Sequence, residues 1–71
     1  MEISREELLV LGTRIKNERE LKGLSQTELA NIIGKDQPSL NRVEKGRVNP
    51  SYLFLLEIAK GLNLPMWELI K

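Results

Sequence analysis

The segment 24–47 constrains the fold of this chain most, because it contains two helix starts separated by a single glycine turn. Ser25-Gln26-Thr27-Glu28 is a capping box, in which the serine and glutamate side chains satisfy free backbone N–H groups at a helix start. Gly34 is typical of the left-handed residue that ends a helix, and Asp36 is suited to cap the next one. The pattern predicts two short helices joined by a tight turn over residues 25–46.

Helix signals flank this segment on both sides. Ser4-Arg5-Glu6-Glu7 is another capping box, and Gly23 suits the end of the helix that it opens. Asn49-Pro50 indicates the start of a further helix, with a cap followed by proline at the first helical position, and Pro65 starts a short last one. Apolar residues at three- and four-residue steps predict the buried sides: Leu8, Leu11, Ile15, Leu29, Ile32, Ile33, Leu40, Val43, Tyr52, Leu55, Leu56, Ala59 and Leu62. We therefore predict an all-α fold of five helices, in a single domain over residues 1–71.

Length and composition narrow the classes of function. A chain of 71 residues can form one small domain. It has no cysteine and no histidine, which excludes a disulfide, a thiolate zinc site, a thiol nucleophile and an imidazole base. No apolar run approaches the roughly 20 residues of a membrane helix, and the N-terminus lacks the features of a signal peptide. We expect a cytoplasmic protein that is not an enzyme and has no metal, cofactor, small-molecule ligand or membrane partner.

Two opposite charges occupy positions where an apolar residue is due. Arg19 lies four residues after Ile15 on the inward side of the first helix, and Glu44 lies four residues after Leu40 on that of the third. A lone buried charge is very costly, whereas a bidentate pair of arginine and carboxylate tolerates burial far better. We therefore predict a structural ion pair between Arg19 and Glu44, although each side chain could instead reach solvent at the edge of its stripe.

The outward side of the helix after Asp36 carries side chains that suit the edges of DNA bases. The net charge of +1 and the pI near 8.1 do not by themselves indicate nucleic acid. Glutamine and asparagine can bind adenine with two hydrogen bonds, arginine can bind guanine in the same way, and proline offers only apolar contact. The predicted base contacts are Gln37, Pro38, Asn41 and Arg42, in the major groove of double-stranded DNA. The predicted phosphate contacts around them are Ser25, Gln26, Lys35, Ser39, Lys45, Arg47 and Asn49.

Several of these motifs together resemble the Cro/C1-type (XRE) family of helix-turn-helix proteins, over residues 11–69. They are L-G-x-R-I from Leu11, R-x-x-K-G-L-S-Q-x-E-L-A from Arg19, the E-x-G from Glu44, and N-P-S from Asn49. The resemblance implies a compact, five-helix, lambda-repressor-like DNA-binding domain that regulates transcription, in which Gln26 contacts the DNA backbone and braces the next helix. It also implies that Gln37, Pro38 and Arg42 hold the base-reading positions and that Arg19 and Glu44 form a buried pair. Pro38 departs from the polar residue that is common there, so we expect sequence preference at that position to depend more on DNA shape.

The C-terminal part, residues 50–71, carries large apolar groups that predict dimerisation. One helix pair makes a small contact with DNA, and family members usually bind a palindromic operator as two-fold dimers. The predicted interface is Phe54, Met66, Trp67 and Ile70, although Trp67 and Leu69 could instead complete the core. The alternative to DNA binding is a protein–protein adaptor or antitoxin-type module that keeps the fold.

Overall fold

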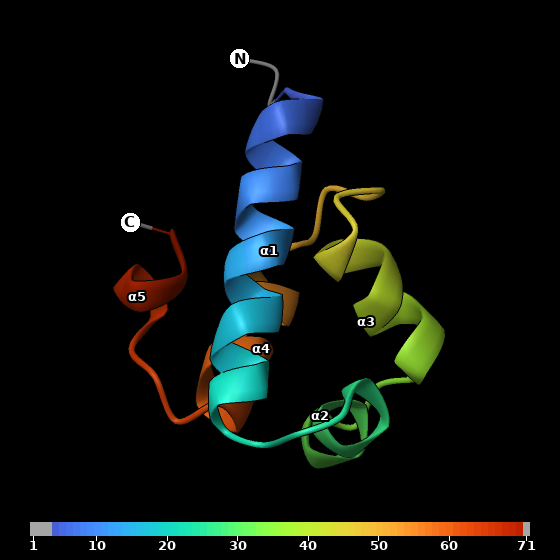
Figure 1. Cartoon of the computed structure of the whole chain (residues 1–71), viewed down its shortest axis with the longest axis vertical. Coiled ribbons are helices and arrows are strands. Elements are labelled where there is room, and N and C mark those ends of the chain that lie inside the picture. The colour runs from blue at the N-terminus through green and yellow to red at the C-terminus, as the bar shows by residue number, and fades with distance from the viewer. Residues whose placement is uncertain (1–3, 71) are drawn as a thin grey trace.

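A computed structural model describes residues 4–70, and this part of the chain is entirely helical, without a strand. The five helices are α1 (Arg5–Leu21), α2 (Gln26–Ile33), α3 (Gln37–Glu44), α4 (Tyr52–Gly61) and α5 (Met66–Ile70). α1 runs the length of the molecule, with α2 and α3 on one side of it and α5 on the other (Figure 1). The predicted all-α fold of five helices is confirmed.

The caps predicted for the first three helices are present. The Ser4 and Ser25 hydroxyls accept the backbone N–H of Glu7 and Glu28, and each glutamate carboxylate accepts the serine N–H in return. These bonds lower the pKa of both glutamates, because they favour the charged carboxylate. Gly34 has φ +70° and ends α2, as expected. The two capping boxes therefore fix the starts of α1 and α2, and Gly34 fixes the end of α2 where the central turn begins.

The start of α4 differs from the prediction. The cap is Ser51, whose hydroxyl accepts the backbone N–H of Phe54, and the helix begins at Tyr52. Asn49-Pro50 therefore precedes the helix instead of opening it. The reason is that serine is also a strong cap and its hydroxyl reaches a first-turn N–H, so the start lies two residues later than proline alone suggests.

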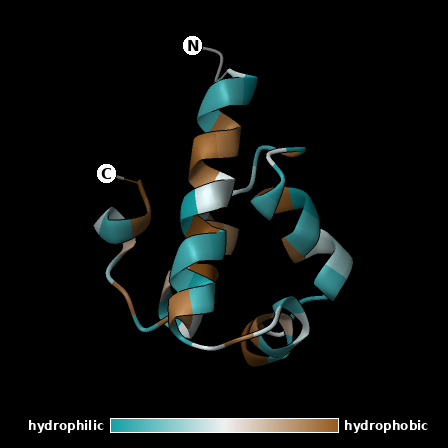
Figure 2. Cartoon of the chain, viewed as in Figure 1, coloured by the Kyte–Doolittle hydropathy of each residue, from teal (hydrophilic) through white to brown (hydrophobic). Residues whose placement is uncertain are grey.

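The apolar sides of the helices enclose one core. Its fully or almost fully buried members are Ile15, Leu29, Ala30, Leu40, Val43, Ile58, Ala59, Leu62 and Leu69. Hydrophobic and hydrophilic residues alternate along α1 and α3, as expected for helices that bury one side only (Figure 2). No helix of residues 4–70 is long and apolar enough to span a bilayer.

Two residues predicted to lie in the core are exposed. Ile32 is 58% exposed and Tyr52 is 65% exposed. On α2 the buried side is centred on Leu29 and Ala30, which leaves Ile32 at the rim. On α4 the buried residues are Ala59, which the predicted stripe included, and Ile58, which it omitted. The helix is therefore rotated relative to that stripe, and Tyr52 in its first turn points away from the core.

Gly12 allows α1 to approach the end of α3 very closely. A Cβ atom at this position would lie 2.4 Å from the backbone oxygens of both Val43 and Glu44. Backbone atoms cannot move aside as a flexible side chain can, so any larger residue must push the two helices apart. Gly12 therefore helps to set the position of α3, the helix with the predicted base contacts.

We expect Gly12→Ala to lower the free energy of unfolding by about 1–3 kcal/mol, as overpacking does, despite the better helix propensity of alanine. Urea denaturation followed by circular dichroism would measure the change. Thr13→Ala is the matched control, because Thr13 is the exposed neighbour in the same helix. Equal stability of the two variants would show that α1 and α3 are not in tight contact.

Candidate nucleic-acid interface

α3 packs its inner side on α1 and α2 and presents its outer side to solvent. Leu40, Val43 and Glu44 are buried on the inner side. The five outer residues are half-buried or exposed: Gln37, Pro38, Asn41, Arg42 and Lys45. The structure thus brings the four predicted base-contacting residues together on one accessible face.

The predicted ion pair between Arg19 and Glu44 is present and buried. Arg19 Nε donates to Glu44 Oε2 at 2.8 Å and Nη2 donates to Oε1 at 3.0 Å, while Nη1 donates to the backbone oxygen of Leu24 at 2.7 Å. Arg19 is 7% exposed and Glu44 is 4% exposed. The hydrogen bonds with Glu44 raise the pKa of Arg19, although burial opposes the change. The pair joins α1 to α3, and the bond to Leu24 also ties α1 to the residues just before α2.

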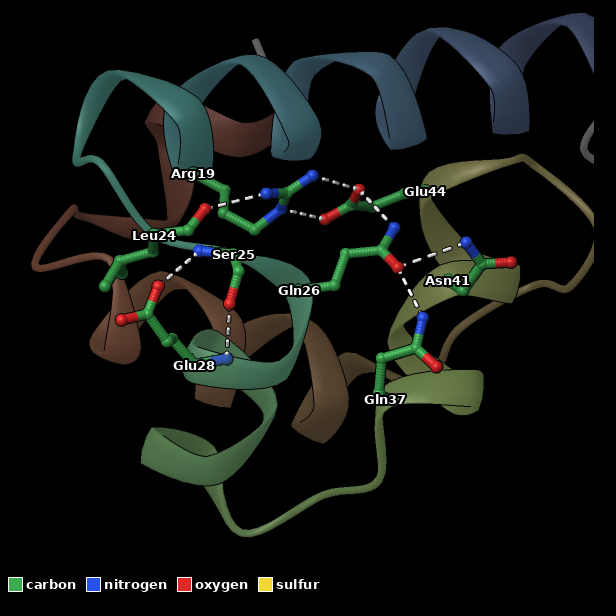
Figure 3. Close-up of polar contacts among 8 residues, drawn as sticks. All are labelled: Arg19, Leu24, Ser25, Gln26, Glu28, Gln37, Asn41 and Glu44. Carbon is green, nitrogen blue, oxygen red and sulfur yellow. Dashed lines mark hydrogen bonds and ion pairs between the residues drawn. The ribbon is translucent and has the colours of Figure 1, made fainter.

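Gln26 connects this pair to the outer side of α3 (Figure 3). Its Nε2 donates to Glu44 Oε1 at 2.9 Å. Its Oε1 accepts from Nε2 of Gln37 at 2.5 Å and from Nδ2 of Asn41 at 3.1 Å. One amide therefore contacts the buried carboxylate with one end and two outer amides with the other.

The chemistry of the carboxylate fixes the direction of every bond in this network. An ionised carboxylate only accepts hydrogen bonds, so Gln26 must present its NH₂ group to Glu44. Its oxygen then faces α3, and both Gln37 and Asn41 must donate to it. Each of these two amides keeps its carbonyl oxygen and one N–H, which are the acceptor and donor that a two-bond contact with adenine needs.

A second polar chain lies at the start of α3. The Asp36 carboxylate accepts the Ser39 backbone N–H at 3.0 Å through Oδ2 and the Ser39 hydroxyl at 2.8 Å through Oδ1. Nη2 of Arg42 donates to the Ser39 hydroxyl oxygen at 3.2 Å. The two bonds from Ser39 chiefly lower the pKa of Asp36, and the charge of Arg42 adds to the effect. The predicted phosphate contact Ser39 thus already uses its hydroxyl proton within the protein.

The predicted phosphate contacts differ in their surroundings. Ser25, Lys45, Arg47 and Asn49 are exposed. Lys35 is different, because its Nζ lies 3.6 Å from Glu57 Oε1 and 5.8 Å from the centre of the Phe54 ring. A phosphate would have to compete with Glu57 for this lysine.

Two cationic side chains that sequence reasoning missed also lie beside this site. Arg5 and Lys16 of α1 line one hollow together with Gln26, Lys45 and Arg47. The signal was present in the sequence, since positions 11 apart lie three turns apart on the same side of a helix. It was overlooked because α1 as a whole carries as many acids as bases.

The four residues predicted for a dimer interface do not form one patch. Met66 and Ile70 line an apolar groove between α1, α4 and α5, which also includes Tyr52. Phe54 lines a separate hollow beside Lys35 and Leu53. Trp67 is 59% exposed, so it does not complete the core, whereas Leu69 is fully buried and does.

Residues 4–70 contain no group of three or more Asp or Glu side chains placed to hold a metal ion. The carboxylates with a lowered pKa are helix caps. The arrangement offers hydrogen-bond donors and acceptors on a rigid helix, which suits recognition.

Comparison with known proteins agrees with this geometry. A family model described as helix-turn-helix, HTH_3, matches residues 15–69. The chain is 41% identical over 56 residues to the ImmF control region 10 kDa protein of Bacillus phage phi105, covering 79% of this chain and 62% of the phage protein. It is 34% identical to the uncharacterized HTH-type transcriptional regulator y4dJ of Sinorhizobium fredii, covering 86% of this chain and 79% of that protein.

A solved structure shares the fold over most of this chain. The restriction-modification controller protein C.AhdI from Aeromonas hydrophila has a TM-score of 0.89 and 36% sequence identity, covering 90% of this chain and 97% of that one. The chain thus spans nearly all of the controller but less than two thirds of the phage protein.

We expect Arg19→Met or Glu44→Met alone to lower the free energy of unfolding by about 3–5 kcal/mol, because each strands a buried charge. The double variant should lose less than the sum of the two single losses, since it leaves no unpaired charge. Urea denaturation of all four proteins would measure the coupling. Strictly additive losses would show that the two side chains do not depend on each other.

Proposed function

Because the chain belongs to the HTH_3 helix-turn-helix family, we propose that it regulates transcription by binding double-stranded DNA sequence-specifically, with α3 in the major groove. The observation that carries the proposal is the outer side of α3, where two amides and a guanidinium stand on a helix fixed by a buried ion pair. The major groove of B-DNA is wide enough to admit an α-helix such as α3.

The geometry supports a role for each base-reading residue. Gln37 and Asn41 each offer a free acceptor and a free donor, which match N6 and N7 of adenine. Arg42 is exposed and suits O6 and N7 of guanine. Pro38 can contact a thymine methyl group only through its ring. We propose that the three polar side chains carry most of the base discrimination.

Phosphate contacts would position α3 over its bases. We propose that Arg47, Lys45, Ser25 and Asn49 contact the DNA backbone, and that Arg5 and Lys16 extend the contact along α1. Gln26 contributes through the bonds that hold Gln37 and Asn41, and its place at the N-terminus of α2 also lies where phosphates bind readily. Lys35 can contact a phosphate only if its ion pair with Glu57 breaks.

A two-fold dimer would double the small contact of one α3 helix. We propose that the apolar surface around α5 forms its interface, with Met66, Trp67 and Ile70 joined by Tyr52. Several of these side chains are more than half exposed, and a stable monomer rarely gathers so many large apolar groups at one place. Phe54 is half-buried in another hollow, so we leave it out of this interface.

Selection of bound duplexes from a random pool is expected to return a defined site, and Arg42→Ala should then weaken discrimination at one base pair per half-site by about 1–3 kcal/mol. Arg47→Ala is the control: it should weaken all sequences alike and reduce the salt slope by about one. A pool without enrichment would overturn the proposal and favour a protein-binding adaptor.

Sedimentation at micromolar concentration is expected to show a dimer, which Ile70→Asp should convert to a monomer by placing a charge in the interface. Ile32→Asp is the matched control, because Ile32 and Ile70 are both isoleucines that are 58% exposed. A wild-type monomer that stays monomeric on a selected duplex would reject the interface.

A further inference from the structure

Asp36 places a negative charge on the face that is proposed to meet DNA. It caps α3, it is exposed, and it lies within reach of Arg42 through Ser39. The cap alone does not need a charge, since asparagine and serine cap helices about as well as aspartate. A carboxylate close to phosphates weakens binding, so the charge needs another explanation.

The number of protons available in the Asp36–Ser39–Arg42 chain provides an explanation for this charge. The Ser39 hydroxyl has a single proton and donates it to Asp36 Oδ1. Its oxygen is then left to accept, and it accepts from Arg42 Nη2. The ionised carboxylate thus turns Ser39 into an acceptor that holds one N–H of the guanidinium. Four guanidinium N–H groups, of the five that arginine has, remain for a base.

The held guanidinium differs from a free one in two ways. An exposed arginine has many rotamers, and ordering it beforehand reduces the entropy lost on binding. The charge of Asp36 also repels any phosphate that would compete with a base for Arg42, whereas guanine O6 and N7 are uncharged acceptors. Both effects favour a base contact over a backbone contact.

We propose that Asp36 is a specificity-determining residue: it positions Arg42 through Ser39 for a base and keeps it from DNA phosphates. The inference rests on the proposed function, in which Arg42 reads a base pair. Asp36 itself touches no base in this proposal, so it is a positioning residue.

The Asp36→Asn variant tests the inference while keeping the cap. Its amide oxygen can still accept the Ser39 backbone N–H, but its NH₂ group would donate to the Ser39 oxygen, occupy one of the two lone pairs that can accept from Arg42 and release the hydroxyl proton that Asp36 had held. Affinities for the selected duplex, for a duplex changed at the Arg42-dependent base pair, and for a scrambled duplex would be measured by fluorescence anisotropy at several salt concentrations. Thermal melts would verify that the variant folds.

We expect Asp36→Asn to bind the scrambled duplex about fivefold more tightly, since one unit charge near another is worth about 1 kcal/mol in water. A bidentate contact with a base favours the correct base pair by roughly 5–150-fold. In Asp36→Asn, this preference at the Arg42-dependent base pair should fall by at least about threefold. Ser39→Ala keeps the charge and loses only the bridge, so it should lower discrimination without tightening binding to the scrambled duplex.

The double variant Asp36→Asn/Arg42→Ala separates positioning from general repulsion. If Asp36 acts through Arg42, adding Asp36→Asn to Arg42→Ala leaves discrimination at that base pair unchanged. Undiminished discrimination in the single variant Asp36→Asn would overturn the inference, even with tighter binding to every duplex. Absence of any sequence preference in the wild type would overturn the proposed function as well, which distinguishes the two failures.

Discussion

The buried contact of Arg19 with Glu44 determines where the outer side of α3 lies. The fork of two hydrogen bonds holds α1 and α3 at one angle, and Gly12 lets their backbones meet closely enough for the fork to form. Buried ion pairs add little net stability compared with apolar packing, so their value here is geometric. The third guanidinium nitrogen bonds to Leu24, which ties the start of α2 to the same point. One arginine therefore aligns three helices whose apolar contacts alone would permit some sliding.

The two polar networks on α3 share one principle, in which an ionised carboxylate sets the direction of a chain of neutral groups. Glu44 orients Gln26, and Gln26 orients Gln37 and Asn41. Asp36 orients Ser39, and Ser39 holds Arg42. The first chain starts from a buried charge and the second from an exposed one, so the first is the more rigid. Together they hold Gln37, Asn41 and Arg42, the proposed base-reading residues, before any ligand binds, which reduces the entropy lost on binding.

Local signals in the sequence were sufficient for most of the fold. Capping boxes and left-handed glycines act within a single turn, so α1, α2 and α3 could be located from their own residues, and the charges on two apolar stripes predicted the ion pair. The errors arose where two local signals competed or where packing decided. Ser51 displaced Asn49 as the cap of α4, and the rotation of α4 buried Ile58 in place of Tyr52. The bonds of Gln26 to Gln37 and Asn41 join residues more than ten positions apart, and no local pattern encodes them. The convergence of Arg5 and Lys16 on Arg47 also depends on how α1 crosses the end of α3.

The bond direction fixed by Glu44 limits how this surface can evolve. Because the Gln26 oxygen faces positions 37 and 41, both positions must supply a donor, and an acid at either would face an acceptor oxygen at hydrogen-bonding distance. Glutamate and aspartate are the side chains that accept from cytosine N4, so under the proposed function a single replacement at either position is not expected to produce a preference for cytosine. Position 42 is restricted in a similar way, because the Ser39 oxygen accepts from Arg42 and the Asp36 carboxylate lies behind it. If this face reads DNA as proposed, a change toward an acid at 37 or 41 requires a compensating change at residue 26, and one at 42 requires a compensating change at residue 36.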